Sequence, residues 1–82
     1  MNQVLVRAIE KHGKLNQTIQ AIQELGELIV ALTKGDLDSI LEEIADVEVM
    51  IEQLKYMYGS TSTIKTSKIK RLNERMERDS IE

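Results

Sequence analysis

The chain has 82 residues, of which 41% are hydrophobic, and its formal net charge is -3. A chain of this size has room for one domain with a modest core, and association commonly supplies the burial that such a core lacks. The absence of cysteine excludes a disulfide framework, a thiol nucleophile and a zinc site built on cysteine. With two tyrosines and no phenylalanine or tryptophan, aliphatic side chains must form the core, which favours helices over a β-sandwich or barrel.

Charge is unevenly distributed along the chain. Residues 20–55 carry nine acids against two bases, whereas residues 56–82 carry six bases against four acids. Nucleic acid polymers bind to basic faces, so the acidic centre argues against such a partner. No segment has the pattern of a signal peptide or the roughly 18 consecutive apolar residues of a membrane span. We therefore expect a cytoplasmic protein that does not bind membranes.

Apolar residues recurring at intervals of three and four predict an all-α fold in a single domain over residues 1–82. Glycines and capping residues divide the pattern into segments. The four expected helices cover residues 2–12, about 16–34, about 36 or 38 to 58, and a last segment from the polar 60–63 loop towards residue 79.

The second and third predicted helices form an antiparallel hairpin that turns at Gly35. The apolar stripe of the third helix is expected to consist of Leu37, Ile40, Leu41, Ile44, Val47, Ile51, Leu54 and Tyr58. Val49, Met50 and Met57 lie off this stripe, which suggests that a partner subunit covers another side of the helix. We expect a homodimer or homotetramer in which the units assemble as a bundle.

Two acidic segments are placed symmetrically about Gly35. The first contains Glu24 and Glu27, the second contains Glu43 and Asp46, and both read acid, aliphatic, small, acid, aliphatic. At 1.5 Å rise per residue, both pairs lie roughly 12 to 16 Å from the turn and therefore face each other at the same level. Each acid precedes a stripe residue, which places its carboxylate at the rim of the apolar face.

Acid pairs three residues apart carry little information by themselves, because about two or three are expected by chance in a chain of this composition. Two further pairs near the C-terminus lie among bases and are consistent with a solvated helix surface. The central pairs differ, because no base lies between Lys14 and Lys34 or between Lys34 and Lys55. The alternative interpretation is that these four acids are exposed and bind no ligand. A ligand for four carboxylates would be a hard cation, Mg²⁺ first or Mn²⁺.

The run Gln23-Glu24-Leu25-Gly26-Glu27-Leu28, together with Glu42-Glu43-Ile44-Ala45-Asp46-Val47, resembles the MazG-like all-α nucleoside triphosphate pyrophosphohydrolases. The signature of that family is ExxE followed at variable spacing by ExxD, and the resemblance extends over residues 4–78. It implies a four-helix unit whose four acids, Glu24, Glu27, Glu43 and Asp46, bind Mg²⁺ and act in catalysis. It also implies hydrolysis of a nucleoside triphosphate to a monophosphate and pyrophosphate.

Family members often place basic residues of the last helix on the phosphates of the substrate, and the segment around Lys68 and Arg71 resembles the one that does so. These two residues are three apart and share a helix face. The alternative is that they are solvated bases. Gln23 departs from the frequent acidic doublet of the family, which puts a second metal in doubt. The leading hypothesis is thus a Mg²⁺-dependent (deoxy)nucleoside triphosphate pyrophosphohydrolase, active as an oligomer with part of each site supplied by a neighbour.

Two alternatives of other classes follow from the same residues. A catalytically weak or inactive module that senses a nucleotide or binds a protein partner would keep the helices, and the scarcity of aromatic side chains for base recognition favours it. A structural helical oligomer would have no ligand at the acids. In that case Mg²⁺ would leave its stability unchanged, and Glu24→Gln would be neutral or stabilising because it removes repulsion.

Overall fold

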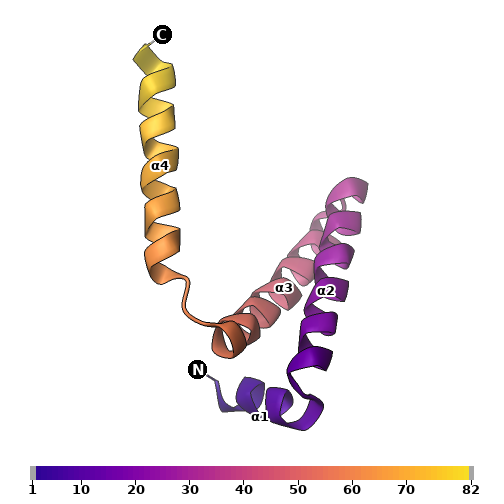
Figure 1. Ribbon diagram of the computed structural model, residues 1–82. Helices are drawn as coiled ribbons and strands as arrows, with labels where there is room; N and C mark the ends of the chain where they lie inside the picture. The colour runs from indigo at the N-terminus through magenta and orange to yellow at the C-terminus, as the bar shows by residue number, and fades with distance from the viewer. Residues whose placement is uncertain (1, 82) are drawn as a thin grey trace.

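The computed structural model describes residues 2–81, which form four α-helices and no strand. The helices are α1 (Gln3–His12), α2 (Lys14–Lys34), α3 (Leu37–Tyr58) and α4 (Ser62–Ile81) (Figure 1). The predicted all-α class is confirmed. The second helix begins at residue 14 rather than near residue 16, because Gly13 alone, at φ +87°, separates it from α1.

The turn between α2 and α3 is set by two neighbouring residues. Gly35 takes the left-handed conformation, with φ +76° and ψ +15°, and its N–H donates to the Ala31 carbonyl at 3.0 Å. Asp36, rather than Asp38, caps α3: one carboxylate oxygen accepts from Ser39 N at 3.2 Å and from Ser39 Oγ at 2.6 Å. Because these bonds favour the ionised form, they lower the pKa of Asp36. The cap and the glycine therefore fix where the hairpin reverses.

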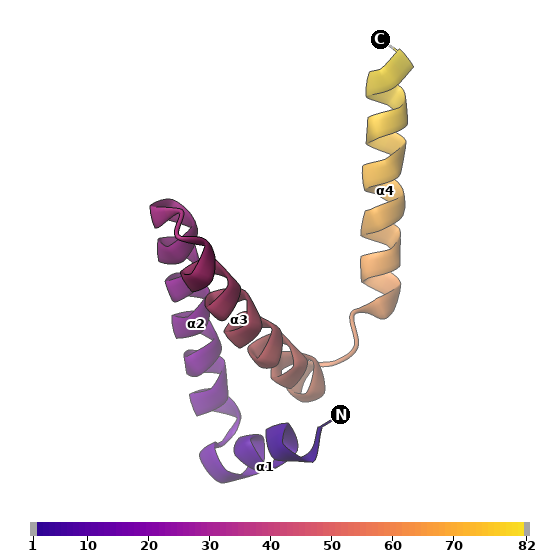
Figure 2. The same ribbon diagram turned by 180° about the vertical axis from the view of Figure 1, so that it is seen from behind.

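The antiparallel α2–α3 hairpin forms the body of the molecule. The short helix α1 lies across the open end of the hairpin and contacts both α2 and α3 (Figures 1 and 2). Helix α4 stands apart: no Cα of α4 lies within 8 Å of a Cα of α1, α2 or α3. Figure 2 shows the same separation from behind. The described part of the chain is therefore a three-helix unit, with α4 attached outside its close packing.

The facing sides of α2 and α3 each follow a heptad spacing, and we name these two rows the inner seams. The residues of both inner seams are buried or half-buried. In α2 they are Gln17, Ala21, Glu24, Leu28 and Ala31, and in α3 they are Ile40, Glu43, Val47, Met50, Leu54 and Met57. Alternating steps of three and four are typical of antiparallel helices packed at a shallow angle.

This packing corrects the expected apolar stripe of α3. Met50 is buried and Met57 half-buried in the inner seam, so neither is free for a partner subunit. Five residues of the expected stripe are instead exposed: Leu37, Leu41, Ile44, Ile51 and Tyr58. The error arose because α3 has aliphatic residues around more than half of its circumference, so that periodicity alone does not select the facing side.

The core of one chain is small. Among the described residues the buried apolar side chains are Ala21, Ala31, Val47 and Met50, and no large side chain is fully buried. The radius of gyration is 16.3 Å, whereas a compact domain of this length has about 12 Å. A single copy therefore leaves much of its aliphatic surface in water.

Alanine substitutions at the two glycines of the hairpin should change the free energy of unfolding in opposite directions. Gly35→Ala should lower the free energy of unfolding by about 1 to 2 kcal/mol, because a side chain is strained in the left-handed region. Gly26 lies inside α2 with nothing within 4 Å of an added Cβ, so Gly26→Ala should raise it by about 1 kcal/mol. Urea unfolding measures both values, and equal signs would contradict this account of the turn.

Candidate metal centre

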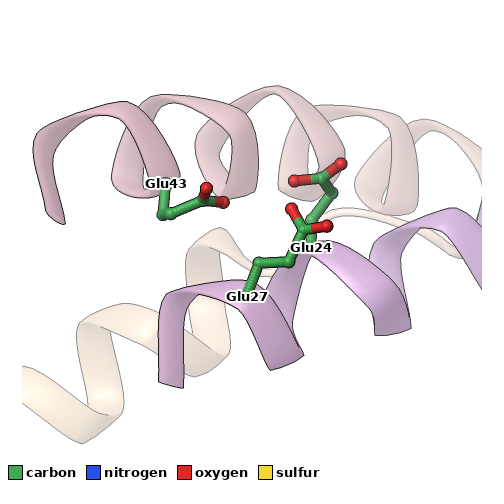
Figure 3. Close-up of side chains that lie close together, drawn as sticks. All are labelled: Glu24, Glu27 and Glu43. Atoms are coloured by element: carbon green, nitrogen blue, oxygen red, sulfur yellow. The ribbon is translucent and has the colours of Figure 1, made fainter. Parts of the chain in front are cut away.

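Three glutamates meet at the middle of the hairpin. Glu24 and Glu27 extend from successive turns of α2 and Glu43 extends from α3, so that the three carboxylates point toward one another (Figure 3). One carboxylate oxygen from each residue lies within 4.8 Å of the other two. The mirror placement about Gly35, read from the sequence, thus brings acids from both helices to one level.

Two of these carboxylates lie deeper than the sequence indicated. Glu24 and Glu43 occupy inner-seam positions and are half-buried, whereas Glu27 is exposed at the rim. Gln20 Nε2 donates to Glu24 Oε1 at 2.9 Å and orients that side chain. Glu24 Oε2 and Glu43 Oε2 are buried and have no hydrogen-bond partner. A buried carboxylate oxygen without a hydrogen-bond partner destabilises the folded chain. A positively charged ligand between the two oxygens would remove this destabilisation.

The pKa of Glu24 is raised above its ordinary value. Burial is the largest cause, because removal from water disfavours the charged form, and the neighbouring Glu27 carboxyl group acts in the same direction. The negative charges of Glu27 and Asp46 raise it further, and the hydrogen bond from Gln20 lowers it. In the folded chain Glu24 is therefore destabilised as an anion.

Asp46, the fourth expected ligand, is exposed and lies outside the cluster of three. It is nevertheless near enough for its charge to act on Glu24. A change of side-chain rotamer is the simplest way for an exposed aspartate to approach a cation held by the other three. The structure thus assembles three of the four predicted acids directly and places the fourth beside them.

The donor set fits a hard divalent cation. All candidate ligands are carboxylate oxygens, which Mg²⁺ and Mn²⁺ prefer, whereas zinc is bound mostly by histidine and cysteine. A cation between Glu24, Glu27 and Glu43 would neutralise the buried oxygens and leave positions open for water or a phosphate oxygen. The residues present therefore fit the metal that the sequence predicts.

A groove of about 730 Å³ runs beside the cluster toward the turn of the hairpin. This volume is within the range of small-molecule sites. Its lining residues are Gln23, Gly26, Glu27, Val30, Ala31, Lys34, Ser39 and Glu43. Lys34 was assigned no functional role from the sequence, yet it is seven residues after Glu27 and therefore shares its helix face. That spacing was the signal that could have identified it.

The two expected phosphate ligands, Lys68 and Arg71, lie on α4 and are exposed. No Cα of α4 lies within 8 Å of a Cα of α2 or α3, so the structure does not bring these bases to the acids within one chain. Lys68 instead lines an open groove together with Ile51 and Lys55 of α3. Lys68 and Arg71 line a small depression of about 190 Å³ together with Leu72 and Arg75, which confirms that they share a face of α4.

Comparison with protein-family models finds no match, and searches of curated proteins and of solved structures find none either. Family membership therefore stays a prediction that depends on the two acidic segments. None of the helices in the described part of the chain has the length and hydrophobicity to span a membrane.

The raised pKa of Glu24 predicts how the metal-free protein depends on pH. Because the folded state binds this proton more tightly than the unfolded state, Glu24 favours folding at low pH, and this contribution is lost as pH rises through its raised pKa. In chelator, Glu24→Gln should therefore be more stable than the natural protein at pH 7, and the difference should shrink toward pH 4. Thermal unfolding across this range measures it, with exposed Glu42→Gln as the control.

Proposed function

We propose that this protein is a Mg²⁺-dependent (deoxy)nucleoside triphosphate pyrophosphohydrolase that yields a nucleoside monophosphate and pyrophosphate. The observation that carries the proposal is the convergence of Glu24, Glu27 and Glu43 within 4.8 Å, with two buried oxygens lacking a partner. The resemblance of the two acidic segments to the MazG-like enzymes supplies the reaction. Glu24, Glu27, Glu43 and Asp46 are the proposed metal ligands and catalytic residues.

Each acid has a role that follows from its position. Glu24 and Glu43 hold the cation from opposite helices, and Gln20 keeps Glu24 oriented through its 2.9 Å hydrogen bond. Glu27 and Asp46, exposed at the rim, are placed to orient water and to take up its proton as it adds across the α–β phosphoanhydride bond. When bound, Mg²⁺ or Mn²⁺ neutralises charge on the phosphates and activates water.

The phosphates need positive charge beside the acids. Lys34 supplies it from within the groove of the same chain. Lys68 and Arg71 would reach the groove beside the acids only if α4 extends to a neighbouring subunit, because no Cα of α4 lies within 8 Å of a Cα of its own hairpin. The proposed enzyme is a homodimer or homotetramer, as expected from the modest core of one chain.

Pyrophosphate release should be detected for at least one nucleotide in a panel of ribo- and deoxynucleoside triphosphates with Mg²⁺. Glu43→Gln should lower the rate by about a hundredfold or more, because one metal ligand is lost. Glu42→Gln, at the adjacent exposed position, is the matched control and should keep the natural rate. Absence of turnover with both Mg²⁺ and Mn²⁺ would show that the proposed catalysis is wrong.

Lys34→Gln should raise KM for the triphosphate about tenfold with a small effect on kcat, since one charge-assisted contact to phosphate is lost. Steady-state kinetics measure both constants. Lys70→Gln serves as control, because Lys70 is exposed on α4 about 160° around the helix from Lys68. An unchanged KM in Lys34→Gln would remove Lys34 from the site. Raised KM in Lys68→Gln and Arg71→Gln would support the contribution of α4.

One observation favours a second candidate, a nucleotide-sensing or protein-interaction module with weak or no catalysis. The residues that line the groove include no aromatic side chain on which a base could stack. A nucleotide that raises Tm with Mg²⁺, yet releases no pyrophosphate, would favour this module over the enzyme. If neither Mg²⁺ nor nucleotide changes Tm, the acids have no ligand of either kind.

A further inference from the structure

The side of the groove that belongs to α2 carries an ordered row of side chains. Gln23, Glu27, Val30 and Lys34 all line the groove, and their steps of four, three and four residues place them along one side of the helix. Gln23 is nearest the open end of the hairpin and Lys34 is nearest the turn. Along the helix axis, Gln23 lies about 6 Å and Lys34 about 10 Å from Glu27, in opposite directions.

The two ends of the groove differ in charge. Lys34 is the one base among the lining residues, and it lies at the end near the turn. On the other side of Glu27, toward the open end of the hairpin, the lining residues of α2 are Gln23 and Gly26, which carry no charge. A ligand with one anionic end and one neutral end would therefore be oriented by the groove.

A nucleoside triphosphate has this asymmetry, because its terminal phosphate is anionic and its nucleoside is neutral. In the proposed reaction the α–β bond lies at the acids, so the β- and γ-phosphates extend to one side and the nucleoside extends to the other. Attraction between the terminal phosphate and Lys34 favours the turn side for the phosphates. The nucleoside then lies on the side of the open end, beside Gln23.

The Gln23 carboxamide is available to a ligand. The residue is exposed, and no hydrogen bond to another described residue holds its side chain, whereas Gln20 is held by its bond to Glu24. A carboxamide offers N–H donors and a carbonyl acceptor together. This combination matches the neighbouring donor and acceptor on the edge of a nucleobase. Gln23 can therefore bind a base in a groove whose lining includes no aromatic side chain for stacking.

Gly26 leaves room beside Gln23. Its φ is not positive and nothing lies within 4 Å of an added Cβ, so neither the backbone nor packing within the chain requires glycine there. The corresponding residue of the second acidic segment is Ala45, which does not line the groove. Glycine weakens a helix relative to alanine, and it is used where a ligand approaches the backbone closely. The glycine thus occurs in the segment that borders the groove.

We propose that Gln23 is a specificity-determining residue that binds the base of the nucleoside triphosphate, while the phosphate chain extends from the acids toward Lys34. This assignment rests on the proposed function, because it takes a nucleotide as the ligand of the groove. It gives the two ends of the α2 row separate roles. Gln23 contributes affinity only for ligands that carry a nucleoside, whereas Lys34 contributes affinity for every triphosphate chain.

Two kinds of ligand separate these roles when binding is measured by calorimetry with Mg²⁺. Inorganic tripolyphosphate has the phosphate chain without a nucleoside, and the α,β-methylene analogues of the four ribonucleoside triphosphates have both but resist cleavage. Gln23→Leu should raise the Kd of the tightest-binding analogue about tenfold, because hydrogen bonds to the base are lost. It should leave the Kd of tripolyphosphate unchanged. Lys34→Gln should raise both constants, because it removes a contact to phosphate.

Gln3→Leu is the matched control. It makes the same substitution at an exposed position of α1, and Gln3 does not line the groove. Both dissociation constants should stay at their natural values in this variant. Thermal unfolding without ligand checks that each variant is folded.

An equal rise of both constants in Gln23→Leu, or a rise of neither, would overturn the proposal. It would also be overturned if Lys34→Gln bound tripolyphosphate as tightly as the natural protein does, because the phosphate chain would then not extend toward the turn. If the analogues bind with the expected pattern but no natural triphosphate is hydrolysed, the proposed catalysis is wrong and the role of Gln23 holds. If natural triphosphates are hydrolysed and Gln23→Leu binds normally, only the role of Gln23 is wrong. If neither kind of ligand binds the natural protein, both proposals are overturned.

Discussion

Two carboxylates occupy positions in the helix interface where a hairpin would ordinarily place aliphatic side chains. Glu24 and Glu43 belong to the inner seams, and each has a buried oxygen without a partner. The hairpin accommodates them because Gly35 and the Asp36 cap set both helices in register, so that the two acids face each other. The arrangement weakens the metal-free chain, as the raised pKa of Glu24 shows, and a bound cation would convert the same oxygens into ligands.

The inner seams alone form a poor core, since charged, amide and alanine side chains hold several of their positions. Most of the larger aliphatic residues of α2 lie instead outside the inner seam and are exposed in one chain, among them Leu15, Ile22, Leu25, Ile29 and Leu32. The acids and the larger aliphatic residues therefore lie on different faces of the same pair of helices. The inner face and its rim hold the acids, while the exposed aliphatic residues form a separate hydrophobic surface on one chain.

The groove beside the acids has negatively and positively charged side chains along its length. It extends from the acid cluster toward Lys34, so in the proposed enzyme a phosphate chain would lie between negative and positive groups with the cation at one end. The bases expected from the sequence, Lys68 and Arg71, belong to a helix that has no Cα within 8 Å of a Cα of its own hairpin. A sensor and an enzyme would share this groove, and they differ in whether water is oriented for attack.

The amino-acid sequence determined the four helices, the turn at Gly35 and the meeting of acids from both helices, because glycines, caps and the pitch of a helix are local properties. Which side of each helix faces its partner was decided only by the tertiary structure. Helix α3 has two heptad rows of aliphatic character, and the choice between Met50 inside and Ile44 outside depends on which row packs against α2. The same packing buried Glu24 and Glu43, left Asp46 at the rim and placed Lys34 in the groove. It also kept α4 apart, since no local pattern says whether a polar helix returns to its own chain.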